Sequence, residues 1–257
     1  MRLRQALSPA SVALIGALAF APAAFAQGAP TSLGEALFGR RPADGRQAQR
    51  APAVARYVSD EGPSFVLQQS GGRALLRFDG SDEVWALRPA DGPRGELIWR
   101  NDVGRPMLNA SRLGGMTVFT PLRPGGAPAA LLNGAEPLRP PQITPEQLLE
   151  RFVAASVRAS RAAGHLVRFD GPADIRAGEE PVLAEAANLA SSAIVRLASA
   201  ARPSRVLARI RQVRVARGRG AAATVVTDTV VVTVDPAQGV AGRPSSDRIV
   251  LAIVSAR

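Results

Sequence analysis

The sequence contains no cysteine and no lysine, and its single histidine is His165. Without cysteine the protein has no thiol nucleophile, no thiolate metal site and no disulfide. Without lysine it has no phosphate-binding P-loop lysine, no Schiff base and no Ser-x-x-Lys acyl-transfer pair. One histidine cannot form a histidine-rich zinc or copper site. We therefore expect no metal and no cofactor, and a fold that is stabilised by apolar packing.

The first 26 residues follow the three-part pattern of a secretory signal peptide. Arg2 and Arg4 form a charged start, an apolar stretch is centred on Val12 to Phe20, and Ala24-Phe25-Ala26 resembles a peptidase site. The apolar stretch is too short for a membrane span of about 20 residues, and no later run approaches that length. We expect cleavage near Ala26, no transmembrane segment after cleavage, and a periplasmic or secreted protein.

Arginine supplies all the basic charge apart from the single histidine. The chain has 32 arginines against 21 acidic residues, which gives a formal net charge of +11 at pH 7. A basic protein in the cell envelope is attracted to anionic polymers and lipid surfaces. Because an exported protein rarely meets nucleic acid, we expect no nucleic-acid partner.

The first half of the exported chain is expected to consist of short strands. Residues 27–56 are rich in alanine, glycine, proline and arginine, which predicts a flexible lead-in. Strand-length segments then alternate with turn sequences such as SGG, DGSD and LGG. The segments are SFVLQQ (64–69), RALLRF (73–78), EVWALR (83–88), ELIWRN (96–101), PMLNAS (106–111) and MTVFTP (116–121). This spacing predicts an antiparallel β-meander over 57–121 that forms a small barrel or a sandwich. Trp85 and Trp99 are expected in its core or as cross-strand partners.

Residues 122–142 contain five prolines and are expected to form an extended interdomain linker. A domain over 143–257 follows. Its first helix is predicted to start at Thr144, with Gln147 at the capping-box position, and to stop at Gly164. Its apolar stripe consists of Leu148, Leu149, Phe152, Val153 and Val157. HLVRFDG (165–171) is expected to be a short strand or an extended turn. A second helix is expected over about 181–200, with a stripe of Leu183, Ala187, Ala190, Ile194 and Leu197.

The last part of the chain is rich in β-branched residues. RIRQVRVARG (209–218) and AAATVVTDTVVVTVD (221–235) flank Gly218-Arg219-Gly220, which predicts a hairpin at these glycines. The apolar run DTVVVTVD indicates a strand that is buried on both faces. Residues 245–255 fit a helix or a third strand, and Ser245, Ser246 and Asp247 after a proline favour the helix. The predicted fold class is α+β, with two helices, a hairpin and a terminal helix in the second half.

Two groups of residues are candidates for a site. Arg209, Arg211 and Arg217 would share one face of a strand and bind phosphate or carboxylate groups; the alternative is a solvated face. A hydrolase would instead need Asp170, Asp174 or Glu179 at the wall of a deep pocket, with arginine or backbone donors beside them.

Two further candidates have weaker support in the sequence. A Ser-His-Asp triad would need His165 together with Ser245 or Ser246 as the nucleophile. No serine of the chain lies in a G-x-S-x-G motif, which speaks against such a triad. Asp79, Asp82 and Glu83 lie in one turn, where carboxylates normally interact only with solvent.

Three stretches resemble a family of exported bacterial proteins that is defined only as a domain of unknown function. They are RYVSDEGPSFVLQQSGGRALLRFDGSDEVWALRP, RNDVGRPMLNASRLGGMTVFTP and GVAGRPSSDRI. The resemblance spans about Tyr57 to Ile253. It implies export and a two-part layout, but no activity and no catalytic residues.

The hypothesis that follows is a non-catalytic envelope module that binds a protein partner or an anionic polymer. Such a role predicts a contiguous exposed apolar or arginine-lined surface. The alternative from another class is a hydrolase, intact or degenerate, that uses carboxylates of the second half. A third possibility is a structural spacer.

Overall fold

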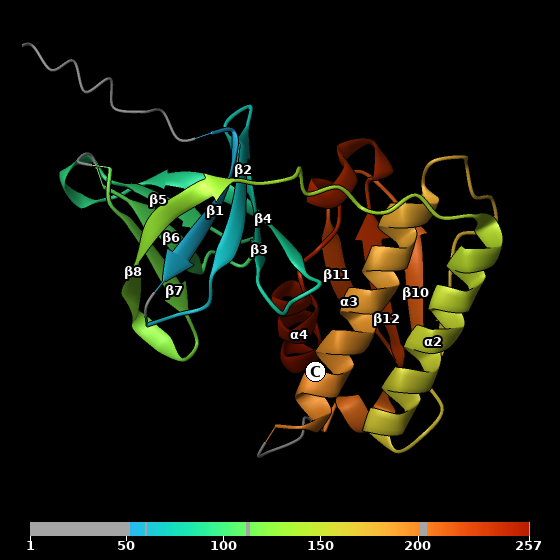
Figure 1. Ribbon diagram of the computed structural model, residues 1–257. Helices are drawn as coiled ribbons and strands as arrows, with labels where there is room; N and C mark the ends of the chain where they lie inside the picture. The colour runs from blue at the N-terminus through green and yellow to red at the C-terminus, as the bar shows by residue number, and fades with distance from the viewer. Residues whose placement is uncertain (1–51, 60, 112–113, 201–204, 257) are drawn as a thin grey trace, which may run out of the picture. The chain divides into compact units, whose positions relative to one another are not determined.

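The computed structural model describes residues 52–59, 61–111, 114–200 and 205–256 (Figure 1). The expected signal peptide and residues 27–51 of the expected lead-in lie outside these ranges. The described residues belong to one compact unit, which contains two β-sheets, each with a hydrophobic core of its own. This arrangement has the α+β character expected from the sequence.

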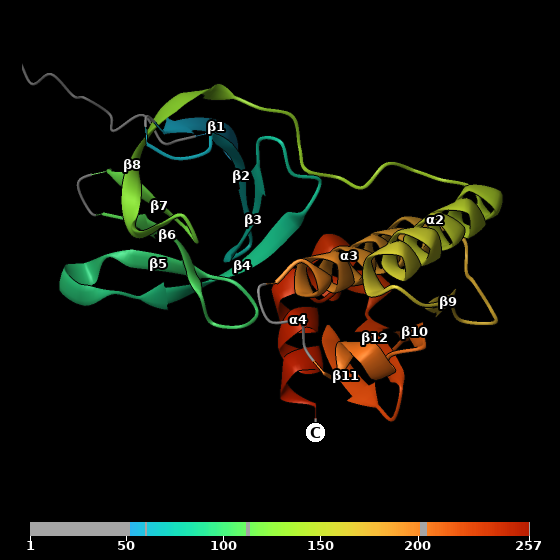
Figure 2. The same cartoon turned by 90° about the horizontal axis from the view of Figure 1, so that it is seen from below.

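The first sheet is an eight-stranded antiparallel barrel whose strands follow one another in sequence order (Figure 2). The strands are β1 (Val54–Ser59), β2 (Phe65–Ser70), β3 (Arg73–Phe78), β4 (Val84–Asp91), β5 (Leu97–Arg100), β6 (Pro106–Ala110), β7 (Met116–Thr120) and β8 (Arg123–Gly134). The six predicted strands are all present, within three residues at each end. The barrel closes because β8 pairs with both β7 and β1.

Two boundaries drawn from composition were wrong. The expected linker 122–142 supplies strand β8, and only the residues after Gly134 connect the barrel to the next helix. The expected lead-in likewise ends earlier, because β1 begins at Val54. Pro128 is tolerated in β8 because it lies in the half that pairs with β7, outside Ala129–Gly134, which pairs with β1. Composition alone did not reveal that Ala127 is buried inside the barrel.

The barrel interior is filled by side chains from most of its strands. Phe65, Leu76, Leu87, Leu108 and Val118 are fully buried there. Trp99 is also buried, and Trp85 packs partly buried against the same cluster, so the core positions predicted for both tryptophans are confirmed. They are not cross-strand partners of each other, because Trp85 opposes Leu76 whereas Trp99 opposes Pro89 and Leu108.

The second sheet has the strand order β11-β12-β10-β9 and is packed against two long helices (Figures 1 and 2). Its strands are β9 (Arg168–Asp170), β10 (Gln212–Arg217), β11 (Ala222–Val226) and β12 (Thr229–Val234). The helices of this part are α2 (Pro145–Ala163), α3 (Glu180–Ala198) and α4 (Ser246–Ser255), with short 3-10 turns η2 (Leu207–Arg209) and η3 (Pro236–Gly242). A further 3-10 turn, η1 (Pro93–Gly95), lies between β4 and β5 of the barrel. Alternate valines of β10 and β12 are fully buried in the core that the sheet shares with the helices.

Helix α2 starts and stops where the sequence predicts, but it buries a different face. Thr144 and Gln147 form the capping box, and Gly164 ends the helix at φ 73°. Of the predicted stripe only Leu148 and Phe152 are buried, whereas Leu149, Val153 and Val157 are 67%, 56% and 44% exposed. The buried face is completed by Ala155 and Ala159. Small alanine side chains allow the alanine-rich helix α3 to approach α2 closely. A search for large apolar residues overlooks such a face.

The predicted stripe of α3 is buried at all five positions.

The predicted hairpin was placed at the wrong turn. Strands β10 and β11, which flank Gly218-Arg219-Gly220, do not pair, because β12 lies between them and runs parallel to β10. The hairpin joins β11 to β12 through Thr227 and Asp228. Thr227 adopts φ 57°, a left-handed conformation that is unusual for a β-branched residue, and no glycine or proline marks this turn. The run 221–235 therefore appeared to be one strand in the sequence.

The helix expected over 245–255 is confirmed as α4. Its N-cap is Ser245, whose side chain accepts a hydrogen bond from the backbone N–H of Arg248. None of the helices in the described ranges has both the length and the apolar character that a membrane crossing requires.

The packing of β8 against β7 can be tested at two adjacent glycines of β8. Gly126 has φ +86°, and a Cβ there would lie 2.5 Å from Thr117 Cγ2 and 2.9 Å from Phe119 Cε1. Gly126→Ala is expected to lower the free energy of unfolding by about 1–3 kcal/mol because of backbone strain and this crowding. At Gly125 no such contact or strain exists, so Gly125→Ala should change it by less than about 1 kcal/mol. Urea denaturation measures both, and equal effects would contradict the close packing of β8 against β7 at Gly126.

Candidate functional site

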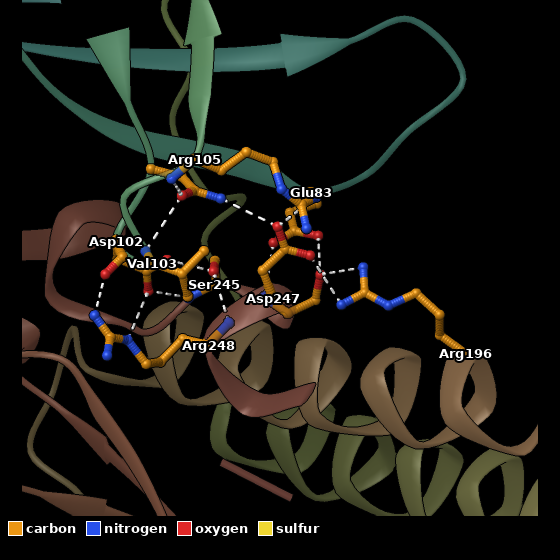
Figure 3. A network of polar contacts seen from close by, with 10 residues as sticks. Glu83, Asp102, Val103, Arg105, Arg196, Ser245, Asp247 and Arg248 are labelled. Carbon is orange, nitrogen blue, oxygen red and sulfur yellow. Dashed lines mark hydrogen bonds and ion pairs between the residues drawn. The ribbon is translucent and has the colours of Figure 1, made fainter. Parts of the chain in front are cut away.

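The start of helix α4 is held by carboxylates that come from the barrel (Figure 3). Ser245 N–H donates to Asp102 Oδ2 at 2.8 Å, and Ser246 N–H donates to Glu83 Oε1 at 2.9 Å. The hydroxyls of the same serines donate to the other oxygens of the same two carboxylates. The first N–H groups of a helix have no partner within the helix and carry partial positive charge, so carboxylates stabilise this end.

A buried carboxylate lies at the centre of the same contacts. Asp247, only 6% exposed, accepts from Arg105 Nη1 at 3.0 Å, Arg196 Nη2 at 2.9 Å and Asn101 Nδ2 at 3.1 Å. Arg105 and Asn101 belong to the barrel, whereas Arg196 belongs to α3 (Figure 3). Two guanidinium groups compensate for the desolvation of this charge. We call this set the junction network: Glu83, Asn101, Asp102, Arg105, Arg196, Ser245, Ser246, Asp247 and Arg248.

Burial changes the titration of Glu83. Its removal from water raises its pKa above the usual range, and the two hydrogen bonds from Ser246 and the nearby Arg243 only partly offset this. The negative charge of Asp247 acts in the same direction as burial. Folding therefore shifts the protonation equilibrium of Glu83 toward its neutral form. All these acids are engaged in contacts within the protein, so we assign the junction network a structural role.

Beside the junction network lies a cavity of about 390 Å³ that is rich in arginine. We call it the arginine pocket. It is lined by strand β3, the β3–β4 turn, the connector before α2, and helices α2 and α3. The charged and amide residues that line it are Arg77, Asp82, Arg139, Arg151, Arg158, Glu185 and Asn188. Val84, Pro141, Ile143, Ala154, Pro181 and Ala184 complete the lining with apolar groups.

Two of these charges are already satisfied by the protein. Arg158 donates from Nε to Ser191 Oγ at 2.9 Å and from Nη2 to Asn188 Oδ1. Glu185 forms an ion pair with the buried Arg243, which also donates to the carbonyl of Val84 at 3.0 Å. These contacts fix part of the pocket wall.

The remaining charges have no partner within the described part of the chain. The guanidinium groups of Arg77, Arg139 and Arg151 and the carboxylate of Asp82 make no side-chain hydrogen bond or ion pair there. Three unpaired cations against one unpaired anion give the pocket a positive character. Guanidinium groups bind carboxylates and phosphates through two parallel hydrogen bonds, so the arrangement suits an anionic ligand.

The arginines predicted from the sequence do not form a common site. Arg209 ends η2, and Arg211 lies before β10 and donates to the carbonyls of Ala208 and Ile210. Arg217 ends β10 and is paired with Glu179 and Asp174. The shared strand face on which the prediction rested is therefore absent, because Arg209 is not in the strand. Anion binding by these three arginines stays a prediction.

The predicted carboxylates are also engaged. The ion pair and hydrogen bonds with Arg217 lower the pKa of both Asp174 and Glu179 below the usual range. Asp170 accepts a hydrogen bond from Gln212. One arginine thus holds two of the three acids ionised, which does not suit an acid–base pair.

The single histidine is also held by the protein. His165 Nε2 lies 2.7 Å from the carbonyl oxygen of Ile210, and Ser245 and Ser246 are bonded to barrel carboxylates, so these groups do not form a triad. Among the described residues no cluster of His, Asp and Glu side chains is arranged to hold a metal ion.

The sequence alone did not show which residues come together in the junction network and in the arginine pocket. The sequence predicts one solvated turn for Asp79, Asp82 and Glu83. In the structure each of the three carboxylates has different surroundings. Asp79 pairs with Arg56, Asp82 lines the arginine pocket, and Glu83 caps α4. The only sequence signal of the junction was the helix-start pattern at Ser245, which indicated a cap but not its partners. The pocket arginines carry no pattern that separates them from the other arginines.

The chain belongs to the family described as Domain of unknown function (DUF4908), whose model matches residues 33–253. This confirms the resemblance to a family without assigned function and extends it toward the N-terminus beyond Tyr57. Neither a curated protein nor a solved structure matches the chain. Family membership therefore carries no activity over to the site.

The raised pKa of Glu83 predicts how stability changes with pH. An acid whose folded-state pKa lies above its unfolded value stabilises the fold while protonated, and this contribution disappears as pH rises through the folded-state pKa. Compared with Glu83→Gln, the wild type should therefore lose stability as pH rises from about 4, the usual glutamate pKa, toward 7. Urea denaturation across this range measures the difference. Glu136→Gln, which removes an exposed carboxylate, is the control. A wild type that gains stability relative to Glu83→Gln would contradict the assignment.

Proposed function

We propose that this protein is an exported, non-catalytic binding protein of the cell envelope whose arginine pocket recognises an anionic ligand. The observation that carries the proposal is the set of three guanidinium groups, on Arg77, Arg139 and Arg151, that line one cavity without a carboxylate partner in the described chain. Apolar residues of the same wall give the uncharged parts of a ligand a surface to pack against.

Three separate segments of the chain supply these cations, which favours a built site over a general basic surface. Arg77 comes from β3, Arg139 from the connector, and Arg151 from α2. Their convergence on one cavity requires the tertiary fold. Most other arginines near the junction, such as Arg105, Arg196 and Arg243, are paired with acids.

The alternative of a hydrolase has less support. Glycoside hydrolysis needs two carboxyl groups across a cleft, and other acid–base reactions need a carboxyl whose pKa is tuned toward neutrality. In the arginine pocket Glu185 is paired with Arg243, which leaves Asp82 as the one carboxylate without a partner in the described chain. Binding without catalysis is the simpler use of this set of groups.

The proposal of export rests on the N-terminal pattern of the sequence. If the pattern directs export, the protein isolated from its native cells lacks residues 1–26. Intact-mass spectrometry of the periplasmic fraction or of the culture medium should then give the mass of a chain that begins at Gln27. A full-length chain confined to the cytosol would contradict export without affecting the binding proposal.

Removal of two pocket cations should abolish most anion binding. We expect tricarballylate, a tricarboxylate without hydroxyl groups, to bind the purified protein at low ionic strength. Arg139→Gln/Arg151→Gln should weaken this binding by at least about tenfold, because each lost charge-assisted hydrogen bond contributes about 1.5–3 kcal/mol. Isothermal titration calorimetry at two salt concentrations measures the affinity and its screening.

The matched control for this experiment removes the same number of charges elsewhere. Arg168 and Arg214 lie exposed on β9 and β10 and do not line the arginine pocket. Arg168→Gln/Arg214→Gln should therefore reduce affinity only slightly, through the smaller net charge. An equal loss in both double variants would show that the overall charge binds the anion, not the pocket.

A further inference from the structure

The carboxylate of Asp82 is the feature of the arginine pocket that a simple anion does not explain. It faces the same cavity as the three unpaired arginines, yet it makes no ion pair with any arginine in the described ranges. A carboxylate repels an anionic group placed near it and accepts hydrogen bonds only from donors. A ligand that fits the whole pocket therefore carries both anionic groups and neutral donors.

A second cavity continues the pocket in the direction of Asp82. It measures about 320 Å³ and shares Asp82, Arg158 and Asn188 with the arginine pocket. Asn188 uses its Oδ1 to accept from Arg158, and its Nδ2 has no partner in the described chain. Ser192, whose hydroxyl is equally unpartnered there, also lines this second cavity. The second cavity is also lined by Glu83 and Arg196, which are bonded to Ser246 and Asp247, so its unpartnered polar side chains in the described chain include those of Asp82, Asn188 and Ser192.

Asp82, Asn188 and Ser192 all line the second cavity and offer it both hydrogen-bond acceptors and donors. Asp82 accepts, Asn188 Nδ2 donates, and the Ser192 hydroxyl does both. Hydroxyl groups on adjacent carbons of a sugar ring need this combination, because each hydroxyl both donates and accepts. Apolar side chains such as Pro141, Ile143 and Pro181 line the first cavity and provide surfaces for the C–H faces of such a ring.

The geometry points to an acidic saccharide as the ligand. Its carboxylate or phosphate groups are held by Arg77, Arg139 and Arg151, and its hydroxyl groups bond to Asp82 and Asn188. This inference rests on the proposed function, because it names the ligand class of the same pocket. The two adjoining cavities, of about 390 and 320 Å³, offer more space than a single small anion fills.

The test compares probes that differ in charge and in hydroxyl groups. Calorimetric titrations use trigalacturonate, glucose 6-phosphate, neutral maltotriose and hydroxyl-free tricarballylate, together with triglutamate as an acidic peptide. We expect an acidic saccharide to bind at least about fivefold more tightly than tricarballylate, and maltotriose to bind more than about tenfold less tightly than trigalacturonate. Glucose 6-phosphate shows in addition whether one sugar unit with a single phosphate group is enough for binding.

Asp82→Asn then gives opposite results for the two kinds of anion. It replaces one of the two acceptor oxygens that sugar hydroxyls can use by an NH2 donor, and it removes a negative charge that repels simple anions. We expect it to weaken binding of the preferred acidic saccharide by about three- to tenfold and to strengthen or leave unchanged that of tricarballylate. The control is Asp91→Asn, which removes an exposed carboxylate from β4 outside the pocket and should change both probes alike.

The outcomes separate the two proposals. If tricarballylate binds through the pocket arginines but both acidic saccharides bind no better, the saccharide inference is overturned and the proposed function stands. Tighter binding of triglutamate than of either saccharide overturns it in favour of an acidic peptide. An Asp82→Asn variant that binds the saccharide more tightly also overturns it. If no anionic probe binds the wild type, the proposed function fails as well.

Discussion

The capping of helix α4 by carboxylates of the barrel is the interaction on which the rest of the structure depends. Glu83 and Asp102 satisfy N–H groups that would otherwise have no partner, and Asp247 is buried between arginines of the barrel and of α3. The two arginines that pair with Asp247 are about half exposed, so water weakens each ion pair. The contacts are specific nonetheless, because a shifted helix would leave several polar groups unsatisfied at once.

The arginine pocket depends on the junction network through adjacent residues. Asp82, which lines the pocket, precedes Glu83, which is bonded to Ser246. Arg243 lies just before α4 and holds both Glu185 and the carbonyl of Val84, two further residues of the pocket wall. A change that loosens the start of α4 is thus expected to move residues of the pocket wall as well. The arginine pocket is built from strands and helices that have separate cores, and these contacts join them.

Pairing with carboxylates of the protein separates the arginines of this chain into two groups. A guanidinium group that lies beside a carboxylate of the protein is neutralised, as Arg217 is by Glu179 and Asp174. A group that lines a cavity without such a partner remains available to a ligand, as in Arg77, Arg139 and Arg151. The density of arginine along the chain does not distinguish the two cases, because the densest run, near Arg209, contains the paired Arg217.

Short-range features were determined by the sequence alone. Thr144, Gln147 and Gly164 placed the ends of α2, glycine-rich turns placed six strands of the barrel, and Ser245 placed the start of α4, because caps and turns depend on residues only a few positions apart. Long-range features were decided by the tertiary structure. They include the closure of the barrel by β8, the insertion of β12 between β10 and β11, and the partners of Glu83 and Asp82. Each of these joins residues that are far apart in the chain, and with one sequence no local pattern records which distant strand or charge will be the neighbour.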